Sequence, residues 1–141
     1  MPVALNHGGP ASGFVIAYQG IKIAVVTDTS ARLSPQTLGA LQGVDILLAD
    51  TFSEDLDQVK QLYKDIGEKS PPDLQTSWPH MTIDESMALR EKIAARTLYT
   101  IHMSRFMAPH QQLVKKYETD HVKIGWDGLV IPLLSGATSK N

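Results

Sequence analysis

The sequence contains no cysteine, which excludes disulfide bonds and thiolate metal ligands from its 141 residues. It also lacks an apolar run of about 18 residues, the length that a membrane-spanning helix needs, and it lacks the basic and then apolar start of a secretory signal. Positive charge is not in excess: the chain has 13 Lys and Arg residues and 15 Asp and Glu residues, a net charge of −2, so there is no overall basic surface for nucleic acid. We therefore expect a cytoplasmic globular domain, or a large piece of one, in which histidine and carboxylate sites remain open.

A helix and a strand follow one another in the central stretch, residues 78–106. Thr82 and Glu85 form the T-x-x-E pattern of a capping box, which predicts that a helix begins directly after Thr82. The apolar run 97–101 then predicts a buried strand. This alternation is typical of an α/β fold.

Strand and helix patterns also alternate along the rest of the chain. Helices are expected to begin at the caps Ser34 and Ser53 and after Pro109, and the polar segment 68–77 is expected to be a loop. Two-residue turns at 19–20 and 127–128 each predict a β-hairpin. The expected strands are 2–6, 13–18, 21–26, 44–49, 97–101, 122–126 and 129–133.

Together these elements predict a mixed β-sheet with helices on one face. The strand segments 46–48 and 98–101 are apolar on both sides, and such strands need cover on both faces of the sheet. The few short helices supply only one layer of cover. The opposite face is therefore expected to meet another sheet, from a further part of the protein or from another subunit.

Four polar residues lie at the ends of these predicted elements. His7, Asp28 and His102 each follow a strand, and His80 precedes the central helix. In layered α/β folds, ligands collect at the carboxyl ends of strands and the amino ends of helices. We therefore expect at least His80 and His102 to share one rim of the fold.

Imidazole and carboxylate ligands suit zinc, manganese or iron, and a metal-bound water can act as the nucleophile in hydrolysis. His7, Asp28 and His102 are thus candidate metal ligands. The residues alone also admit a structural interpretation, in which His7 is a loop residue, Asp28 a cap and His102 a hydrogen-bonded core histidine.

Asp50, at the end of another predicted strand, and His80 form a second candidate pair. A carboxylate in contact with a histidine orients the ring and favours its protonated form, which makes a proton donor. The alternative is a structural hydrogen bond. Arg105 could bind a phosphate through two parallel hydrogen bonds, or could be an ordinary surface arginine.

Six short motifs, taken together and in their order, resemble the metallo-β-lactamase superfamily, and most of all its ribonuclease Z and cyclic phosphodiesterase branch. They span nearly the whole chain. The motifs are N-H at 6–7, V-T-D-T at 26–29, A-D-T-F at 49–52, P-H-M-T-I-D-E at 79–85, Y-T-I-H-M-S-R at 99–105 and W-D-G-L at 126–129.

The resemblance implies a role for each candidate residue. It implies that His7 binds one metal ion, that Asp28 bridges two ions and that His102 binds the second, with zinc or manganese as the metal. It further implies that Asp50 and His80 form the pair that donates a proton to the leaving group.

The resemblance also implies that Arg105 lies near the substrate phosphate. The signature H-x-H-x-D-H, which in this superfamily precedes the motif of the first histidine, is not among the 141 residues. We therefore expect residues 1–134 to form the C-terminal half of an αββα sandwich, with 135–141 as a flexible tail.

The predicted function is that of a metal-dependent, phosphodiesterase-like hydrolase half that is incomplete or weakly active alone. The predicted substrates are phosphodiesters or other small esters. Three origins fit this prediction: a piece of a larger hydrolase, a natural half that pairs with an N-terminal partner, or a degenerate half that dimerises through its bare sheet face. The third would make the chain a binding or structural module.

Overall fold

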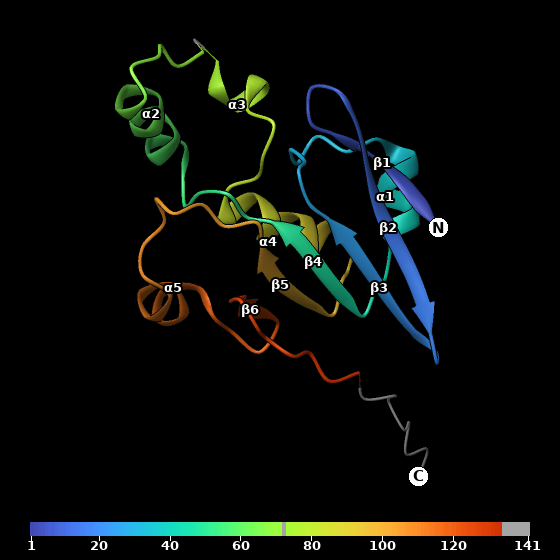
Figure 1. Ribbon diagram of the computed structural model, residues 1–141. Coiled ribbons are helices and arrows are strands. Elements are labelled where there is room, and N and C mark those ends of the chain that lie inside the picture. Colours follow the sequence, from blue (N-terminus) through green and yellow to red (C-terminus); the bar gives the residue numbers. More distant parts are fainter. Residues whose placement is uncertain (72, 134–141) are drawn as a thin grey trace.

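The computed structural model describes residues 1–71 and 73–133 and is organised around one six-stranded sheet (Figure 1). The strands follow one another in the sheet in chain order. The first three strands pair antiparallel, and the later pairs are parallel, so the sheet is mixed as predicted. The strands are β1 (Pro2–Asn6), β2 (Pro10–Tyr18), β3 (Ile21–Val26), β4 (Ile46–Asp50), β5 (Thr97–Ile101) and β6 (Val122–Ile124).

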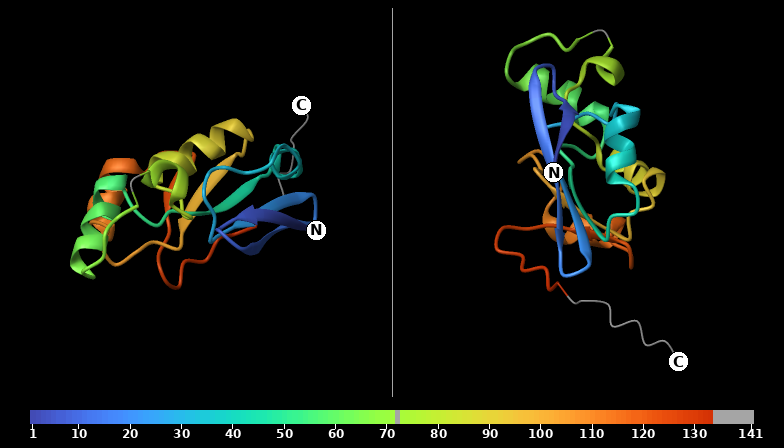
Figure 2. Two further views of the ribbon diagram at one scale, coloured as in Figure 1. Left: turned by 90° about the horizontal axis from the view of Figure 1, so that it is seen from above. Right: turned by 90° about the vertical axis from the view of Figure 1, so that its right-hand side faces the viewer.

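In the described part of the chain, five helices accompany the sheet: α1 (Pro35–Leu41), α2 (Leu56–Asp65), α3 (Leu74–Ser77), α4 (Ile83–Lys92) and α5 (His110–Tyr117). Both views of Figure 2 place α1 and α4 on one side of the sheet and the segment 126–133 on the other. The fold is therefore α/β with a helical layer on one face. Within the described residues, no helix has both the length and the apolar character that crossing a membrane requires.

The inner face of the sheet, under α1 and α4, carries the hydrophobic core. Alternate residues of each strand point to this face because side chains alternate along a strand. Burying each of the larger ones stabilises the fold by about 1.5–3 kcal/mol. The core side chains of the strands include Val3, Leu5, Val15, Ala24, Val26, Leu47, Ala49, Leu98 and Val122.

The opposite side of the sheet, which we call the outer face, keeps large apolar side chains in contact with solvent. Phe14, Ile16 and Tyr18 of β2 are 51%, 47% and 54% exposed. In the strand register Phe14 pairs with Val25, and Val25 pairs with Leu48, so the apolar surface continues across the neighbouring strands. This arrangement confirms the prediction that the short helices cover one face only.

Local signals predicted most of the element boundaries. The Thr82 hydroxyl accepts a hydrogen bond from Glu85 N, and the Glu85 carboxylate accepts one from Thr82 N, which completes the predicted capping box. Ser34 caps α1 as predicted. The prediction that Ser53 caps the next helix was wrong. Ser53 is extended and its carbonyl accepts a hydrogen bond from Ile83 N, so α2 begins later, with Asp55 as its N-cap.

Two further predictions differ from the structure. The segment 68–77 is not wholly a loop, because Asp73 caps the short helix α3. The closing hairpin 122–133 does not form: β6 ends at Ile124, and among the described residues it pairs only with β5. Directly after β6 the backbone passes so close to β5 that only glycine fits at position 125, since a side chain there would come within 2.2 Å of the Thr100 carbonyl oxygen. The predicted tail, 135–141, lies outside the described residues, and the domain boundary at 134 stays a prediction.

Candidate functional site

Five polar side chains gather at one edge of the sheet, at the carboxyl ends of β1, β3, β4 and β5. His7 follows β1, Asp28 follows β3, Asp50 ends β4 and His102 follows β5. His80 joins them from the segment before α4. These four strands run in the same direction, so residues far apart in sequence meet at one rim. The expectation that His80 and His102 share a rim is confirmed, because their rings lie 5.1 Å apart.

Asp28 stands between two of the histidines. Its Oδ1 lies 3.3 Å from His102 Nε2 and 3.9 Å from His7 Nε2. His7 Nδ1 is 3.2 Å from the Pro79 carbonyl oxygen, which fixes Nδ1 as the donor and leaves Nε2 free on the side of Asp28. Each of these histidines thus directs the same ring nitrogen toward one carboxylate oxygen.

Asp50 is fully buried and contacts the other side of the cluster. Its Oδ2 accepts hydrogen bonds from Thr29 N and from His80 Nδ1, both at 2.9 Å. Its Oδ1 has no hydrogen-bond partner among residues 1–71 and 73–133 and lies 3.6 Å from His102 Nδ1. Because Asp50 accepts at His80 Nδ1, the other nitrogen of the His80 ring is available on the open side of the cluster.

Phe52 is a site residue that the sequence patterns did not single out. Its ring stacks on His80 at a centroid distance of 4.6 Å and lies 5.8 Å from His102. Trp78 packs edge-on against Phe52. The Phe52 ring therefore forms an apolar wall beside the imidazoles of His80 and His102. The A-D-T-F motif contained this residue, but nothing in its spacing predicted contact with the histidines.

The backbone at two of the candidate ligands is left-handed. Asp28 has a φ of 54° and His102 a φ of 57°, and they are two of only four described non-glycine residues with positive φ. Such conformations cost free energy and persist where the surrounding fold imposes them, often at functional sites. Their presence here sets the direction in which both side chains leave the rim.

The donor set fits a divalent metal ion. Two ligand atoms that each lie about 2.0–2.1 Å from a tetrahedral zinc ion are roughly 3.3–3.4 Å apart. The Asp28 to His102 separation of 3.3 Å matches this spacing. Ligand atoms of His7, Asp28 and His80 all lie within 4.8 Å of one another, as do those of Asp50, His80 and His102. The cluster therefore divides into two adjoining groups that share His80.

Arg105 lies outside this cluster, on the exposed loop that follows His102. Its guanidinium carbon is 4.9 Å from the centre of the Phe106 ring. Among the described residues, no hydrogen bond or ion pair joins Arg105 to the five clustered side chains.

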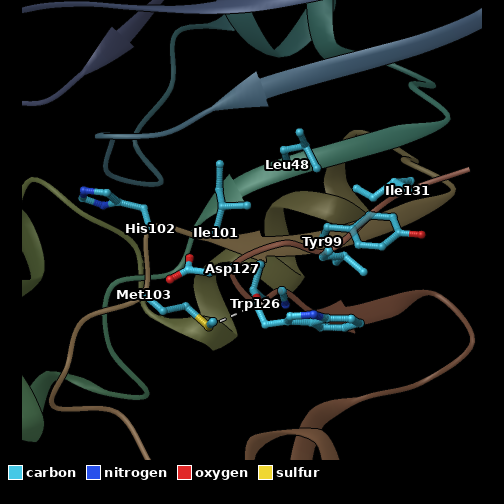
Figure 3. Close-up of a pocket in the computed structure, with 11 residues that line it drawn as sticks. Leu48, Tyr99, Ile101, His102, Met103, Trp126, Asp127 and Ile131 are labelled. Atoms are coloured by element: carbon cyan, nitrogen blue, oxygen red, sulfur yellow. Dashed lines mark hydrogen bonds between the residues drawn. The ribbon is translucent and has the colours of Figure 1, made fainter. Parts of the chain in front are cut away.

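A cavity of about 280 Å³ opens beside His102 and runs along the outer face of the sheet (Figure 3). His102, Met103 and the Asp127 carboxylate lie at one end of it, and Tyr99 and Trp126 at the other. Leu48, Ile101, Leu129 and Ile131 add apolar walls. The polar rim and the bare apolar face are thus continuous.

The fold and the site together define a class of protein: α/β proteins that carry histidines and carboxylates at the carboxyl edge of a mixed sheet. The chain belongs to the beta-lactamase superfamily: its residues 2–103 match the family model described as "Beta-lactamase superfamily domain". A comparison with curated protein sequences found no match.

Solved structures with the same metallo-β-lactamase fold resemble most of this chain. A diphosphatase from the PhnP family is 24% identical, with a TM-score of 0.63, over 92% of this chain and 41% of its own. The short form of human tRNase Z is 19% identical, with a TM-score of 0.64, over 94% and 41%. Zn²⁺-bound PqqB from Methylobacterium extorquens is 18% identical, with a TM-score of 0.61, over 86% and 43%. The chain therefore spans less than half the length of each of these chains.

Proposed function

We propose that this chain is the part of a metal-dependent hydrolase that holds His7, Asp28 and His102 as metal ligands, with phosphodiesters or other small esters as substrates. The observation that carries the proposal is the approach of two imidazole nitrogens to the single carboxylate oxygen of Asp28. The two nitrogens belong to different histidines, His7 and His102, which is consistent with an ion on each side of Asp28. Bound zinc or manganese would supply a water that is acidic enough to act as a nucleophile near neutral pH.

His80 and Asp50 have the geometry of a proton-donating pair in this proposal. Asp50 fixes the His80 ring through Nδ1, and Phe52 supports the face of the ring. The remaining ring nitrogen would give its proton to the oxygen of the leaving group. The buried negative charge of Asp50 would stabilise the protonated ring until that transfer.

Arg105 is proposed to bind the phosphate of the substrate. Its guanidinium is exposed, and it lies three residues after the proposed ligand His102. The planar guanidinium group can form two parallel hydrogen bonds with phosphate oxygens. Esters that carry no phosphate would gain less from this residue.

A partner on the outer face is the second part of the proposal. The exposed side chains of β2 and the cavity beside His102 form one apolar surface, which is unusual on an isolated domain. The chain also spans less than half of the similar solved chains. We propose that a half carrying the H-x-H-x-D-H signature covers this face and supplies the remaining metal ligands. Little or no hydrolysis is then expected from residues 1–141 alone.

A second candidate function is that of a dimerising binding or structural module without catalysis. The same bare outer face favours it, because two copies could cover each other there. The two functions differ in metal binding. The enzyme half needs His7, Asp28 and His102 as ligands, whereas the module does not.

Reconstitution tests the enzyme proposal. A chain that carries an H-x-H-x-D-H half is added, and metal-dependent cleavage of bis-p-nitrophenyl phosphate is followed. Cleavage is expected with the wild-type chain and not with Asp28→Asn, which suits the left-handed backbone but removes the carboxylate charge. The matched control is Asp120→Asn, on an exposed aspartate far from the rim in sequence. Cleavage that survives Asp28→Asn would refute the role of Asp28.

A further inference from the structure

The loop that carries Arg105 is hydrogen-bonded at both of its ends to one short segment, residues 51–54. We infer that Glu54 is the positioning residue that holds the far end of this loop and thereby sets the place of Arg105. The inference rests on the proposed role of Arg105 in binding phosphate. Glu54 itself is far too enclosed to be a substrate contact, with 8% of its surface exposed.

The segment 51–54 runs between the two histidine-bearing loops and hydrogen-bonds to both. On one side, Thr51 N donates to the Ile101 carbonyl and Ser104 N donates to the Phe52 carbonyl. On the other side, Phe52 N donates to the Met81 carbonyl, directly after His80. The segment therefore ties the His80 and His102 loops to one backbone.

The near and far ends of the Arg105 loop are held in different ways. At the near end, the Ser104 N to Phe52 O hydrogen bond of 3.1 Å joins backbone to backbone. At the far end, Ala108 N donates to the Glu54 Oε1 at 3.1 Å. Arg105 lies between these two hydrogen bonds. Of the two, only the one from Ala108 N depends on a side chain, that of Glu54. Figure 1 shows this loop in orange, between β5 and α5.

Glu54 is itself held in place from two helices. Its Oε1 accepts a hydrogen bond from Gln58 Nε2 of α2, and Glu54 N donates to Gln58 Oε1 in return. Its Oε2 accepts from Lys116 Nζ at 3.0 Å and from Tyr117 OH at 3.2 Å, both on α5. Besides Ala108 N, three donors hold this carboxylate, so two of them keep it in place when the Lys116 contact is removed.

The charge state of Glu54 agrees with this arrangement. Burial raises the pKa of the carboxyl, but the hydrogen bonds from Lys116, Ala108 and Gln58 outweigh burial, and the pKa lies below its usual value. Glu54 is therefore ionised at neutral pH.

Amide hydrogen exchange of three variants tests the inference without any ligand. Glu54→Ala removes the acceptor for Ala108 N, so exchange at residues 104–108 should quicken roughly tenfold, while exchange at the core residue Leu98 stays as in the wild type. Glu54→Gln keeps an acceptor oxygen and should restore most of the protection. Lys116→Met is the matched control, since it removes a partner of Glu54 but leaves the contact with Ala108. Unchanged exchange at 104–108 in Glu54→Ala would overturn the inference.

Titration with inorganic phosphate then links the loop to Arg105. The NMR signal of the Arg105 side chain should shift with phosphate, with a severalfold weaker affinity in Glu54→Ala and an unchanged one in Lys116→Met. Equal affinities in the wild type and Glu54→Ala would overturn the positioning role. If the wild type shows no phosphate binding, the proposed role of Arg105 fails, and the exchange data alone decide whether Glu54 places the loop.

Discussion

His80 and Asp50 form the most enclosed polar contact of the rim: His80 Nδ1 lies 2.9 Å from Asp50 Oδ2. Asp50 has no exposed surface, and Thr29 N donates to the same oxygen. A buried carboxylate costs free energy unless it is hydrogen-bonded. The hydrogen bond from His80 therefore stabilises Asp50 in its buried position, and Asp50 in turn orients the His80 ring. The pair therefore fixes the orientation of His80 before any ligand arrives.

The substitution His80→Ala should separate metal binding from turnover. Since His7, Asp28 and His102 are the proposed ligands, the variant should keep its zinc within a few-fold of wild-type affinity. In the reconstituted enzyme it should lose roughly 100-fold or more in kcat, as expected for a missing proton donor. Zinc titration and steady-state kinetics measure the two effects. Loss of zinc in His80→Ala would mean that His80 is a metal ligand and would contradict its role as a proton donor that does not bind the metal.

The capping box ahead of α4 should contribute measurably to stability. Thr82→Ala removes the side-chain acceptor for Glu85 N, so the free energy of unfolding should fall by about 1 kcal/mol. Urea denaturation measures it. Glu85→Gln is the control, because glutamine also serves in a capping box and should cost less. An unchanged free energy of unfolding in Thr82→Ala would contradict the role of the cap.

The stability that Glu54 provides should depend on pH. Its pKa is lowered in the folded chain from an ordinary value of 4.5, so its contribution is fully present above that value and is lost as the pH falls through the lower folded pKa. Glu54→Gln should therefore be less stable than the wild type by about 1–2 kcal/mol at neutral pH. The difference should shrink below about pH 4. Urea unfolding across pH tests this, and a difference that grows in acid would contradict it.

The outer face should carry the association of this chain with its partner. Ile16→Glu puts a charge at the centre of the exposed β2 surface and should weaken that association by an order of magnitude or more, since a buried unpaired charge is costly. Sedimentation or native mass measurement detects the change. The control Ala88→Glu adds the same charge to the exposed side of α4. Equal effects of the two variants would mean that the partner does not bind the outer face.

Much of the fold followed from local chemistry that the sequence displays. The T-x-x-E pattern at Thr82 and the glycine turn at 19–20 act within a few residues, so they predicted α4 and the β2–β3 hairpin. The site residues at strand ends could also be predicted from the sequence, because the parallel course of β3, β4 and β5 brings their carboxyl ends together.

The misplaced elements depended on contacts between distant segments. Ser53 resembles a helix cap, but a backbone hydrogen bond with Ile83 keeps it extended. The segment 129–133 has the composition of a strand, yet it does not pair with β6, and Ile131 lines the cavity of the outer face. Phe52 and Glu54 acquire their roles only through segments 28 to 63 residues away. No local pattern carries that information.

Native mass spectrometry of the purified chain in zinc tests the central claim most directly, because it counts metal ions and chains together. The account predicts at least one zinc ion per chain for the wild type and for Asp120→Asn, and none for Asp28→Asn, with the same number of chains in each assembly. A wild-type assembly without zinc, or zinc that remains in Asp28→Asn, would contradict the claim that His7, Asp28 and His102 form a metal site.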